Sequence, residues 1–167
     1  MANQRIYTVG YGGRHPDEFL ELLRSHQITR IIDVRVRPAE ASMGVYKKAK
    51  RPDRGIEGLL DRAGISYSHF LELGNLFRGL EDWEQRYRAL VQAAGSLLLD
   101  RLREIDEPYC LLCAEKDVAN CHRGIAEHRH RVDLVRGAKT AEKMEKRHAR
   151  CQGRRLRDQR IVVRLLH

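Results

Sequence analysis

Residues 110–124 read CLLCAEKDVANCHRG, and this stretch decides both the fold and the place to look for a site. The apolar run from Tyr109 to Ala114 predicts a buried strand, the polar residues after it predict a loop, and a helix is expected to begin at Arg123 or Gly124. Three of the four cysteines lie here, together with Glu115 and the triplet Cys121-His122-Arg123. The stretch therefore predicts a core strand that opens into a functional loop.

The rest of the chain alternates in the same way. Apolar, β-branched runs predict strands over 5–10, 28–37 and 65–70, and helical spacing predicts helices over 16–26, 57–62, 83–104 and 123–135. Residues 39–55 lack either pattern and are expected to form a long exposed loop. Alternating strands and helices predict an α/β fold: a single domain with a mostly parallel twisted sheet of about four or five strands, covered by helices on both faces.

Length and composition set limits on the class of protein. With 167 residues and 42% hydrophobic residues, the chain fits one globular domain, which we expect over 1–135. Residues 136–167 are expected to form a basic helical or flexible C-terminal segment, with 161–166 as a candidate last strand. No apolar run is long enough to cross a membrane and no secretion signal opens the chain, so a soluble cytoplasmic protein with reduced thiols is expected.

The positive charge is concentrated at one end of the chain. Residues 1–135 carry 21 basic and 20 acidic side chains, whereas residues 136–167 carry 11 and 3. That basic segment contains no Phe, Trp or Tyr, so it lacks the stacking side chains of single-strand binders. A solvated basic segment and a nucleic-acid arm both remain compatible with this pattern.

Four motifs in a fixed order resemble a known family. TVGYG near the start, IIDVRVRP, GISYSHFLELGN and LLCAEKDVANCHRG are similar to the motifs of the family called domain of unknown function 488, over about Ile6 to Val135. The resemblance implies a compact α/β domain with these motifs gathered at one edge. It implies no reaction, and the basic segment after Val135 departs from the family's pattern.

The strand ends predict an anion-binding crevice. In a parallel sheet the turns after the strands share one edge, and ligands bind there. Asp33 is expected to orient Arg35 for a bidentate grip on phosphate or carboxylate, and the helix that begins near Arg123 points its free amides at the same crevice. The candidate ligand-binding residues are Gly10, Tyr11, Gly12, Arg35, His122 and Arg123. In the alternative, Asp33 and Arg35 form an internal salt bridge and the glycines only turn the chain.

The cysteines admit three interpretations. In the first, Cys121 is a nucleophile, with Glu115 or Asp33 as its acid-base partner. In the second, Cys110, Cys113, Cys121 and His122 bind zinc; strand alternation places the first two on opposite faces and the last two are adjacent, so no metal is expected. In the third, the thiols are buried apolar groups, and Arg123 binds an anion or holds the loop to Glu115.

Two functions follow from these residues. The first is an enzyme or ligand-binding domain that acts on an anionic ligand such as a nucleotide, with Asp33, Glu115 and Cys121 as catalytic candidates and no cofactor. The alternative is a nucleic-acid-associated module that uses the 47–54 loop and the basic tail. No membrane partner is expected, and the sequence leaves the oligomeric state open.

Overall fold

A four-stranded parallel sheet forms the centre of the protein, whose computed structural model describes residues 6–131. Strands β1 (Ile6–Gly10), β4 (Tyr109–Cys113), β2 (Arg30–Asp33) and β3 (Ser66–His69) lie side by side in the order β1-β4-β2-β3. Every residue of β1 and β4 is buried, in keeping with their continuous apolar sequences. The predicted α/β fold with a parallel sheet is confirmed.

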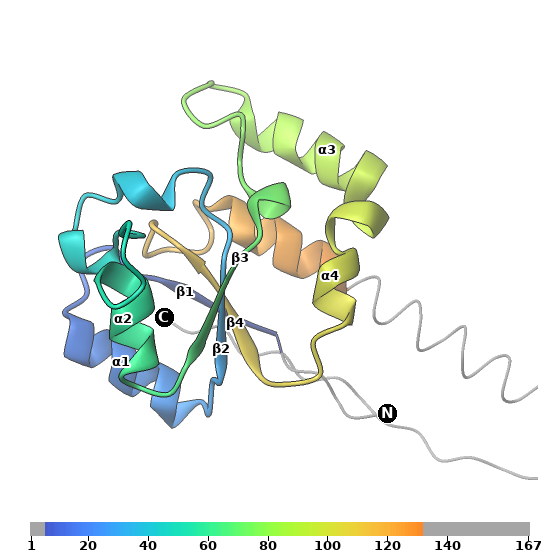
Figure 1. Cartoon of the computed structure of the whole chain (residues 1–167). Helices are drawn as coiled ribbons and strands as arrows, with labels where there is room; N and C mark the ends of the chain where they lie inside the picture. The colour runs from blue at the N-terminus through green and yellow to red at the C-terminus, as the bar shows by residue number, and fades with distance from the viewer. Residues whose placement is uncertain (1–5, 132–167) are drawn as a thin grey trace, which may run out of the picture.

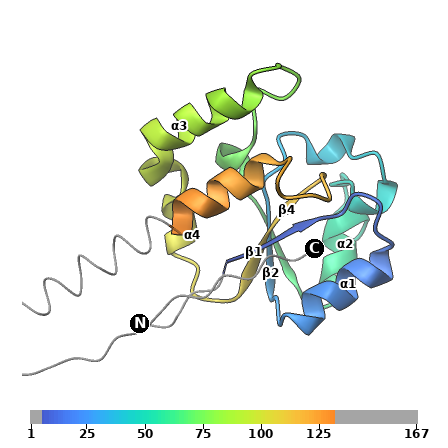
Figure 2. The same ribbon diagram turned by 180° about the vertical axis from the view of Figure 1, so that it is seen from behind.

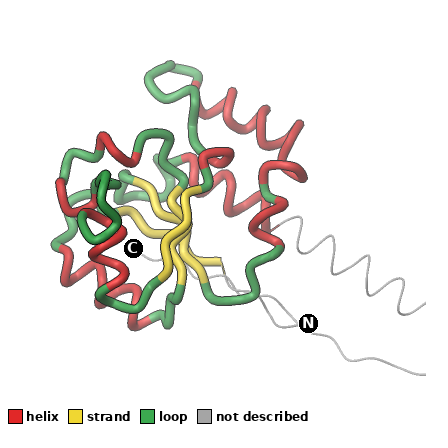
Figure 3. The backbone as a smooth tube through the Cα atoms, in the orientation of Figure 1, coloured by secondary structure: helices red, strands yellow, loops and turns green. Residues whose placement is uncertain are grey.

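Helices cover both faces of this sheet (Figures 1 and 2). Helices α1 (Pro16–Ser25) and α2 (Gly55–Asp61) pack on one face, where Cys110 and Leu112 of β4 point. Helices α3 (Trp83–Leu98) and α4 (Asp100–Arg103) and the helix of residues 122–131 lie on the other side. Leu111 and Cys113 point to that face, because side chains alternate along a strand. The tube drawing shows the same layers, with the strands between two groups of helices (Figure 3).

The long helix expected over 83–104 is interrupted. The helix α3 ends at Leu98 and α4 starts at Asp100, with Leu99 between them at φ −98° and ψ 2°. Leu99 and Leu102 are both fully buried. The buried face of α3 carries Tyr87, Val91 and Gly95, whereas Leu97 is 77% exposed. Gly95 belongs to this face because a Cβ there would lie 3.2 Å from Cγ of Arg129 on the facing helix.

The prediction of an exposed loop over 39–55 is wrong in part. Two short 3-10 turns, Pro38–Glu40 and Gly44–Tyr46, fold this segment back onto the domain. Tyr46 is fully buried, its ring stacks on Tyr11 at 4.6 Å, and its hydroxyl donates to the carbonyl of Arg14 at 3.1 Å. A polar, basic sequence concealed this single aromatic anchor.

The second strand is shorter than the predicted 28–37. It ends at Asp33, whose Oδ1 accepts a hydrogen bond from the backbone N–H of Arg35 at 3.0 Å and so turns the chain out of the sheet. The connection after β2 then leads to α2 on one face, whereas the connection after its neighbour β4 leads to the helix of residues 122–131 on the other (Figure 1). Adjacent strands whose connections diverge in this way leave a crevice at their carboxyl ends.

Two of the sequence expectations lie outside the described residues. These are the basic segment 136–167 and the candidate strand 161–166. Within residues 6–131, none of the helices combines the length and the apolar character needed to span a bilayer.

The sheet requires a glycine at the end of β1. A Cβ on Gly10 would lie 1.8 Å from the carbonyl oxygen of Glu115, a backbone atom of the loop that follows β4. Since a backbone atom cannot move aside like a flexible side chain, we expect Gly10→Ala to lower the free energy of unfolding by about 3 kcal/mol in urea denaturation. Gly44→Ala is the matched control, because nothing lies within 4 Å of that position. Equal stabilities of the two variants would contradict this close packing.

Candidate active site at the carboxyl edge of the sheet

A pocket of about 810 Å³ lies at the crevice where the connections after β2 and β4 diverge. Segments that follow all four strands contribute to its wall. Its lining residues are Tyr11, Arg35, Val36, Arg37, Glu40, Ala41, Ser42, Asn75, Leu76, Arg78, Gly79, Trp83, Cys113, Ala114, Glu115, Asn120, Cys121 and His122. The pocket therefore lies at the edge where the parallel sheet was expected to bind a ligand.

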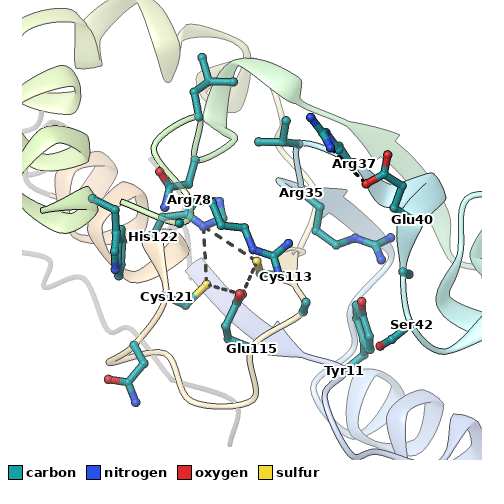
Figure 4. A pocket seen from close by; sticks show the side chains of 18 residues that line it. Tyr11, Arg35, Arg37, Glu40, Ser42, Arg78, Cys113, Glu115, Cys121 and His122 are labelled. Carbon is teal, nitrogen blue, oxygen red and sulfur yellow. Dashed lines mark hydrogen bonds and ion pairs between the residues drawn. The ribbon is translucent and has the colours of Figure 1, made fainter. Parts of the chain in front are cut away.

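Two thiols, a carboxylate and an imidazole meet on one side of this pocket (Figure 4). Cys113 ends β4, Glu115 lies in the loop after it, and Cys121 and His122 stand at the start of the next helix. Oε2 of Glu115 lies 2.8 Å from Sγ of Cys113 and 3.3 Å from Sγ of Cys121. We refer to Cys113, Glu115, Cys121 and His122 as the thiol cluster.

The position and protonation of His122 follow from one hydrogen bond. Its Nε2 lies 3.0 Å from the carbonyl oxygen of Val34, and a carbonyl can only accept, so Nε2 carries a proton. Its Nδ1 then faces the two sulfur atoms, at 3.9 Å from Cys113 and 3.8 Å from Cys121. The ring also packs edge-on against Tyr87 at 5.2 Å, which fixes its orientation.

Arg123 lies beneath the cluster rather than in the pocket. It is fully buried, and its guanidinium donates to the carbonyl oxygens of Glu115 at 2.7 Å and Lys116 at 3.1 Å. Thus Arg123 holds the backbone of the loop that bears Glu115. No carboxylate of residues 6–131 forms an ion pair with this buried guanidinium, so a negative charge nearby is favoured.

The surroundings of the two thiols shift their pKa values in opposite directions. The hydrogen bond with Cys113 and the nearby His122 and Arg123 lower the pKa of Cys121 to about 5, against the opposing effect of burial. The hydrogen bond with Cys121 and burial raise the pKa of Cys113 well above its ordinary value. Cys121 also stands at the N-terminus of a helix, a position that stabilises a thiolate. We therefore assign the thiolate to Cys121 and the protonated thiol to Cys113.

Glu115 acts on the thiols in two ways. Its carboxylate opposes a thiolate on Cys121, since the two groups are 3.3 Å apart, and it accepts the proton of Cys113 at the shorter distance of 2.8 Å. Burial is the largest single influence and raises the pKa of Glu115, but the hydrogen bonds from Cys113, from its own backbone N–H and from Cys121, with the nearby His122, together outweigh it and the net shift is downward. The carboxylate is therefore ionised and hydrogen-bonded at neutral pH.

The same residues are close enough for one metal ion. Sγ of Cys113, Sγ of Cys121 and a ring nitrogen of His122 all lie within 4.8 Å of one another, and all three residues are buried. Cys110 lies on the opposite face of β4, as strand alternation predicts, so the four-residue zinc set considered from the sequence is not assembled. The argument that the adjacent residues Cys121 and His122 diverge does not hold, because the helix start turns both toward Cys113.

Asp33 and Arg35 form a separate buried pair. Arg35 donates from Nε and Nη2 to the two carboxylate oxygens of Asp33 at 2.8 and 2.5 Å and from Nη1 to the carbonyl of Tyr46 at 2.9 Å. The hydroxyl of Tyr67 donates to Asp33 Oδ2 at 2.7 Å. Asp33 is fully buried and does not line the pocket, whereas Arg35 does. The internal salt bridge considered as an alternative is therefore present.

The glycine turn after β1 contacts the protein itself. The N–H of Gly12 donates to the carbonyl of Ala114 at 2.9 Å, and that of Tyr11 donates to Cys113 at 3.3 Å. Tyr11 reaches the pocket, with its ring packed against Tyr46 and 5.1 Å from the guanidinium carbon of Arg35. Gly10 and Gly12 thus let the backbone of the loop after β4 come close, and neither lines the pocket.

Two basic residues of the loop of residues 47–54 form ion pairs within the protein. Lys48 contacts Glu57 at 2.7 Å, and Arg51 contacts Asp53 at 2.8 Å. The basic tail lies outside the described residues. The nucleic-acid interface stays a prediction.

Several pocket residues were not singled out from the sequence. Cys113 was not considered as a partner of Cys121. Arg78 comes from the connection between β3 and α3, which carries no recognisable motif beyond LELGN, and Trp83 is the first residue of α3. Arg78 is exposed and makes no hydrogen bond or ion pair within the described part of the chain. Only the fold brings these side chains to the pocket.

Comparison with known proteins finds a matching family model. A family model described as "Domain of unknown function DUF488" matches residues 15–129. No curated protein and no solved structure matches the chain. The resemblance predicted from the sequence motifs is confirmed, although TVGYG, the first of them, lies ahead of the matched region.

The buried pair of Asp33 and Arg35 predicts a large effect of a small substitution. Asp33→Asn leaves the buried guanidinium of Arg35 without its counter-charge, so we expect the free energy of unfolding to fall by about 3 kcal/mol. Tyr67→Phe removes only one hydrogen bond to Asp33 and should cost about 1 kcal/mol. Asp53→Asn, at an exposed ion pair, serves as the control in urea denaturation. A loss at Asp33 no larger than at Asp53 would show that the pair does not stabilise the fold.

Proposed function

Because the chain belongs to the family described as domain of unknown function DUF488, whose description carries no activity, we propose its function from the site itself. The protein is a cysteine-dependent enzyme that acts on an anionic small molecule bound in the pocket at the carboxyl edge of the sheet. Cys121 is the nucleophile, and Glu115 is its acid-base partner. The observation that carries this proposal is the position of Cys121 in the pocket wall, at a helix start, beside Cys113, Glu115 and His122.

The surroundings of Cys121 supply what a thiolate nucleophile needs. The helix N-terminus, the hydrogen bond with His122 and the charge of the buried guanidinium of Arg123 all favour the charged form. By contrast, Cys110 is completely buried in the other core, where burial raises its pKa, and it does not line the pocket. One described cysteine thus combines thiolate character with access to a ligand.

The pocket favours an anionic ligand. Arg35 forms an ion pair with Asp33, and Arg37 forms one with Glu40. Arg78 forms no ion pair with any other described residue, so its guanidinium can bind a ligand. The side-chain oxygen of Asn75 accepts from the backbone N–H of Phe77 at 2.9 Å, which leaves its NH₂ group as a donor. A volume of about 810 Å³ accommodates a molecule of nucleotide size.

Glu115 is the acid-base group of this proposal, and Asp33 is not. Oε2 of Glu115 lies within hydrogen-bonding reach of both sulfur atoms and lines the pocket. Asp33 lies outside the lining and is saturated by Arg35 and Tyr67, so it positions Arg35. Arg123 acts on Cys121 through its charge and does not touch the ligand.

Alkylation as a function of pH tests the nucleophile. Only the thiolate reacts with iodoacetamide, so a cysteine with a pKa of about 5 should keep its rate as the pH falls from neutrality and lose it only below about 5. An ordinary thiol, with a pKa near about 8.5, loses its rate well above that. Peptide mapping follows each cysteine, and Cys121→Ser is the control. A rate at Cys121 that falls about ten-fold per pH unit from pH 8 downward would contradict the proposal.

Protection from alkylation tests the ligand class. Pyrophosphate, citrate and adenosine monophosphate should slow alkylation of Cys121, whereas adenosine at the same concentration should protect less. Arg78→Ala removes the unpaired cation and should raise the protecting concentration about ten-fold. Arg51→Ala, at an ion pair in the 47–54 loop, is the matched control. Equal protection by neutral and anionic compounds would contradict the proposal that the pocket prefers an anionic ligand.

A further inference from the structure

The geometry points to a two-thiol reaction in which Cys113 resolves an intermediate formed on Cys121, and to an anionic disulfide as the substrate. This inference rests on the proposed function, because it takes Cys121 as the nucleophile. It adds the reaction class, a two-electron reduction, and it gives Cys113 a role of its own.

The two sulfur atoms are placed for a bond with each other. They lie within 4.8 Å, on the same side of the same pocket, at the end of β4 and at the start of the following helix. A disulfide bond of about 2.05 Å would close the short loop between them. Cys110 points to the opposite core, so Cys113 is the described cysteine that can reach Cys121.

The first step is attack on the substrate disulfide. The Cys121 thiolate attacks one sulfur of R–S–S–R′, a Cys121–S–S–R bond forms, and the S–S bond of the substrate breaks. The pair of electrons of that bond leaves with R′S⁻, which takes a proton from solvent. Arg78, at the pocket, holds the anionic part of the substrate.

The second step uses the proton path that the structure provides. The thiol of Cys113 passes its proton to Oε2 of Glu115, 2.8 Å away, and its sulfur attacks Sγ of Cys121. A Cys113–Cys121 bond forms and RS⁻ leaves, taking up the proton. In sum, one substrate disulfide becomes two thiols and two protein thiols become one disulfide, which an external dithiol must reduce before the next turnover.

The electrostatics of the pair drive the order of these steps. The hydrogen bond with Cys121 comes first among the causes that hold the pKa of Cys113 high, followed by burial and then by the charge of Cys121. Once Cys121 is in a mixed disulfide, it carries no negative charge, so its charge and its hydrogen bond no longer raise the pKa of Cys113, whereas burial and Glu115 still do. The first step therefore removes part of the cost of deprotonating Cys113.

The presence of a second thiol favours a disulfide substrate over an acyl or phosphoryl substrate. An acyl or phosphoryl group on Cys121 leaves by hydrolysis or transfer, and a neighbouring thiol adds nothing to that step. A thiol in a mixed disulfide is released by attack of another thiol, which is the group found beside it. The size of the pocket and its unpaired arginine fit an organic anion that contains a disulfide.

The test uses the full chain with Cys110→Ala and Cys151→Ser, so that only Cys113 and Cys121 remain, and oxidised glutathione as the probe. Intact mass after reaction should show the loss of two hydrogens and no adduct, together with release of two equivalents of reduced glutathione. With Cys113→Ser added, one glutathione should stay attached to Cys121. Glu115→Gln should slow the conversion of adduct to internal disulfide about a hundred-fold. Dithiothreitol should restore the reduced protein.

The outcomes separate this inference from the proposed function. Attachment of glutathione to Cys121 that persists although Cys113 is present would overturn the two-thiol reaction and leave the nucleophile intact. No reaction at Cys121 with either glutathione or iodoacetamide would overturn both. A purified protein that holds one equivalent of zinc and reacts only after chelation would overturn the inference in favour of a metal centre at the same residues. Circular dichroism of each variant must match that of the parent chain, and Cys113→Ala replaces Cys113→Ser if the serine variant does not fold.

Discussion

The site depends on the contact between Arg123 and the loop after β4. A fully buried guanidinium donates to the carbonyl oxygens of Glu115 and Lys116 and thereby fixes the path of the chain between β4 and the helix of residues 122–131. The same loop presses on Gly10, where even one methyl group has no room. With its backbone held from both sides, Glu115 places Oε2 at 2.8 Å from Sγ of Cys113 and 3.3 Å from Sγ of Cys121. The arginine thus shapes the thiol cluster without lining the pocket.

This arrangement links the sheet topology to the electrostatics of the cluster. β4 lies between β1 and β2, and its connection leaves toward the opposite face, so the end of β4 and the helix start open into the pocket. The helix start brings a dipole, the guanidinium of Arg123 and the imidazole of His122 to Cys121, while the strand end keeps Cys113 buried among apolar neighbours. Two chemically identical thiols therefore acquire opposite tendencies, one toward the thiolate and one toward the neutral form.

The sequence predicted the fold well because its signals are local. Continuous apolar runs marked β1 and β4, and Pro16 followed by acidic residues marked the first turn of α1. The failures had tertiary causes. Tyr46 anchors a loop that reads as polar, and Asp33 ends a strand early by capping the backbone N–H of Arg35. Gly95, which weakens a helix by propensity, lies on its buried face because Arg129 packs there.

The sequence predicted correctly that the site lies at the carboxyl edge of the sheet. It did not predict which side chains contact one another there. The loop after β4 and the turn after β1 meet where a parallel sheet requires, so the strand-end crevice was predictable. The approach of Cys113 to Cys121 was not, since it depends on how a seven-residue connection folds over Arg123. Asp33 and Arg35 form an ion pair with each other. The sequence motif alone cannot distinguish this internal pair from an arginine that binds a ligand.

The most direct measurement is an NMR titration of the protein with ¹³C-labelled cysteine β-carbons, which reports the charge on each sulfur separately. We expect the Cys121 resonance to shift with a midpoint at about pH 5, while the Cys113 resonance stays at its neutral-thiol position through pH 8. Two resonances that move together at the ordinary thiol pKa of about 8.5 would contradict it, because the loop held by Arg123 would then not separate the two thiols.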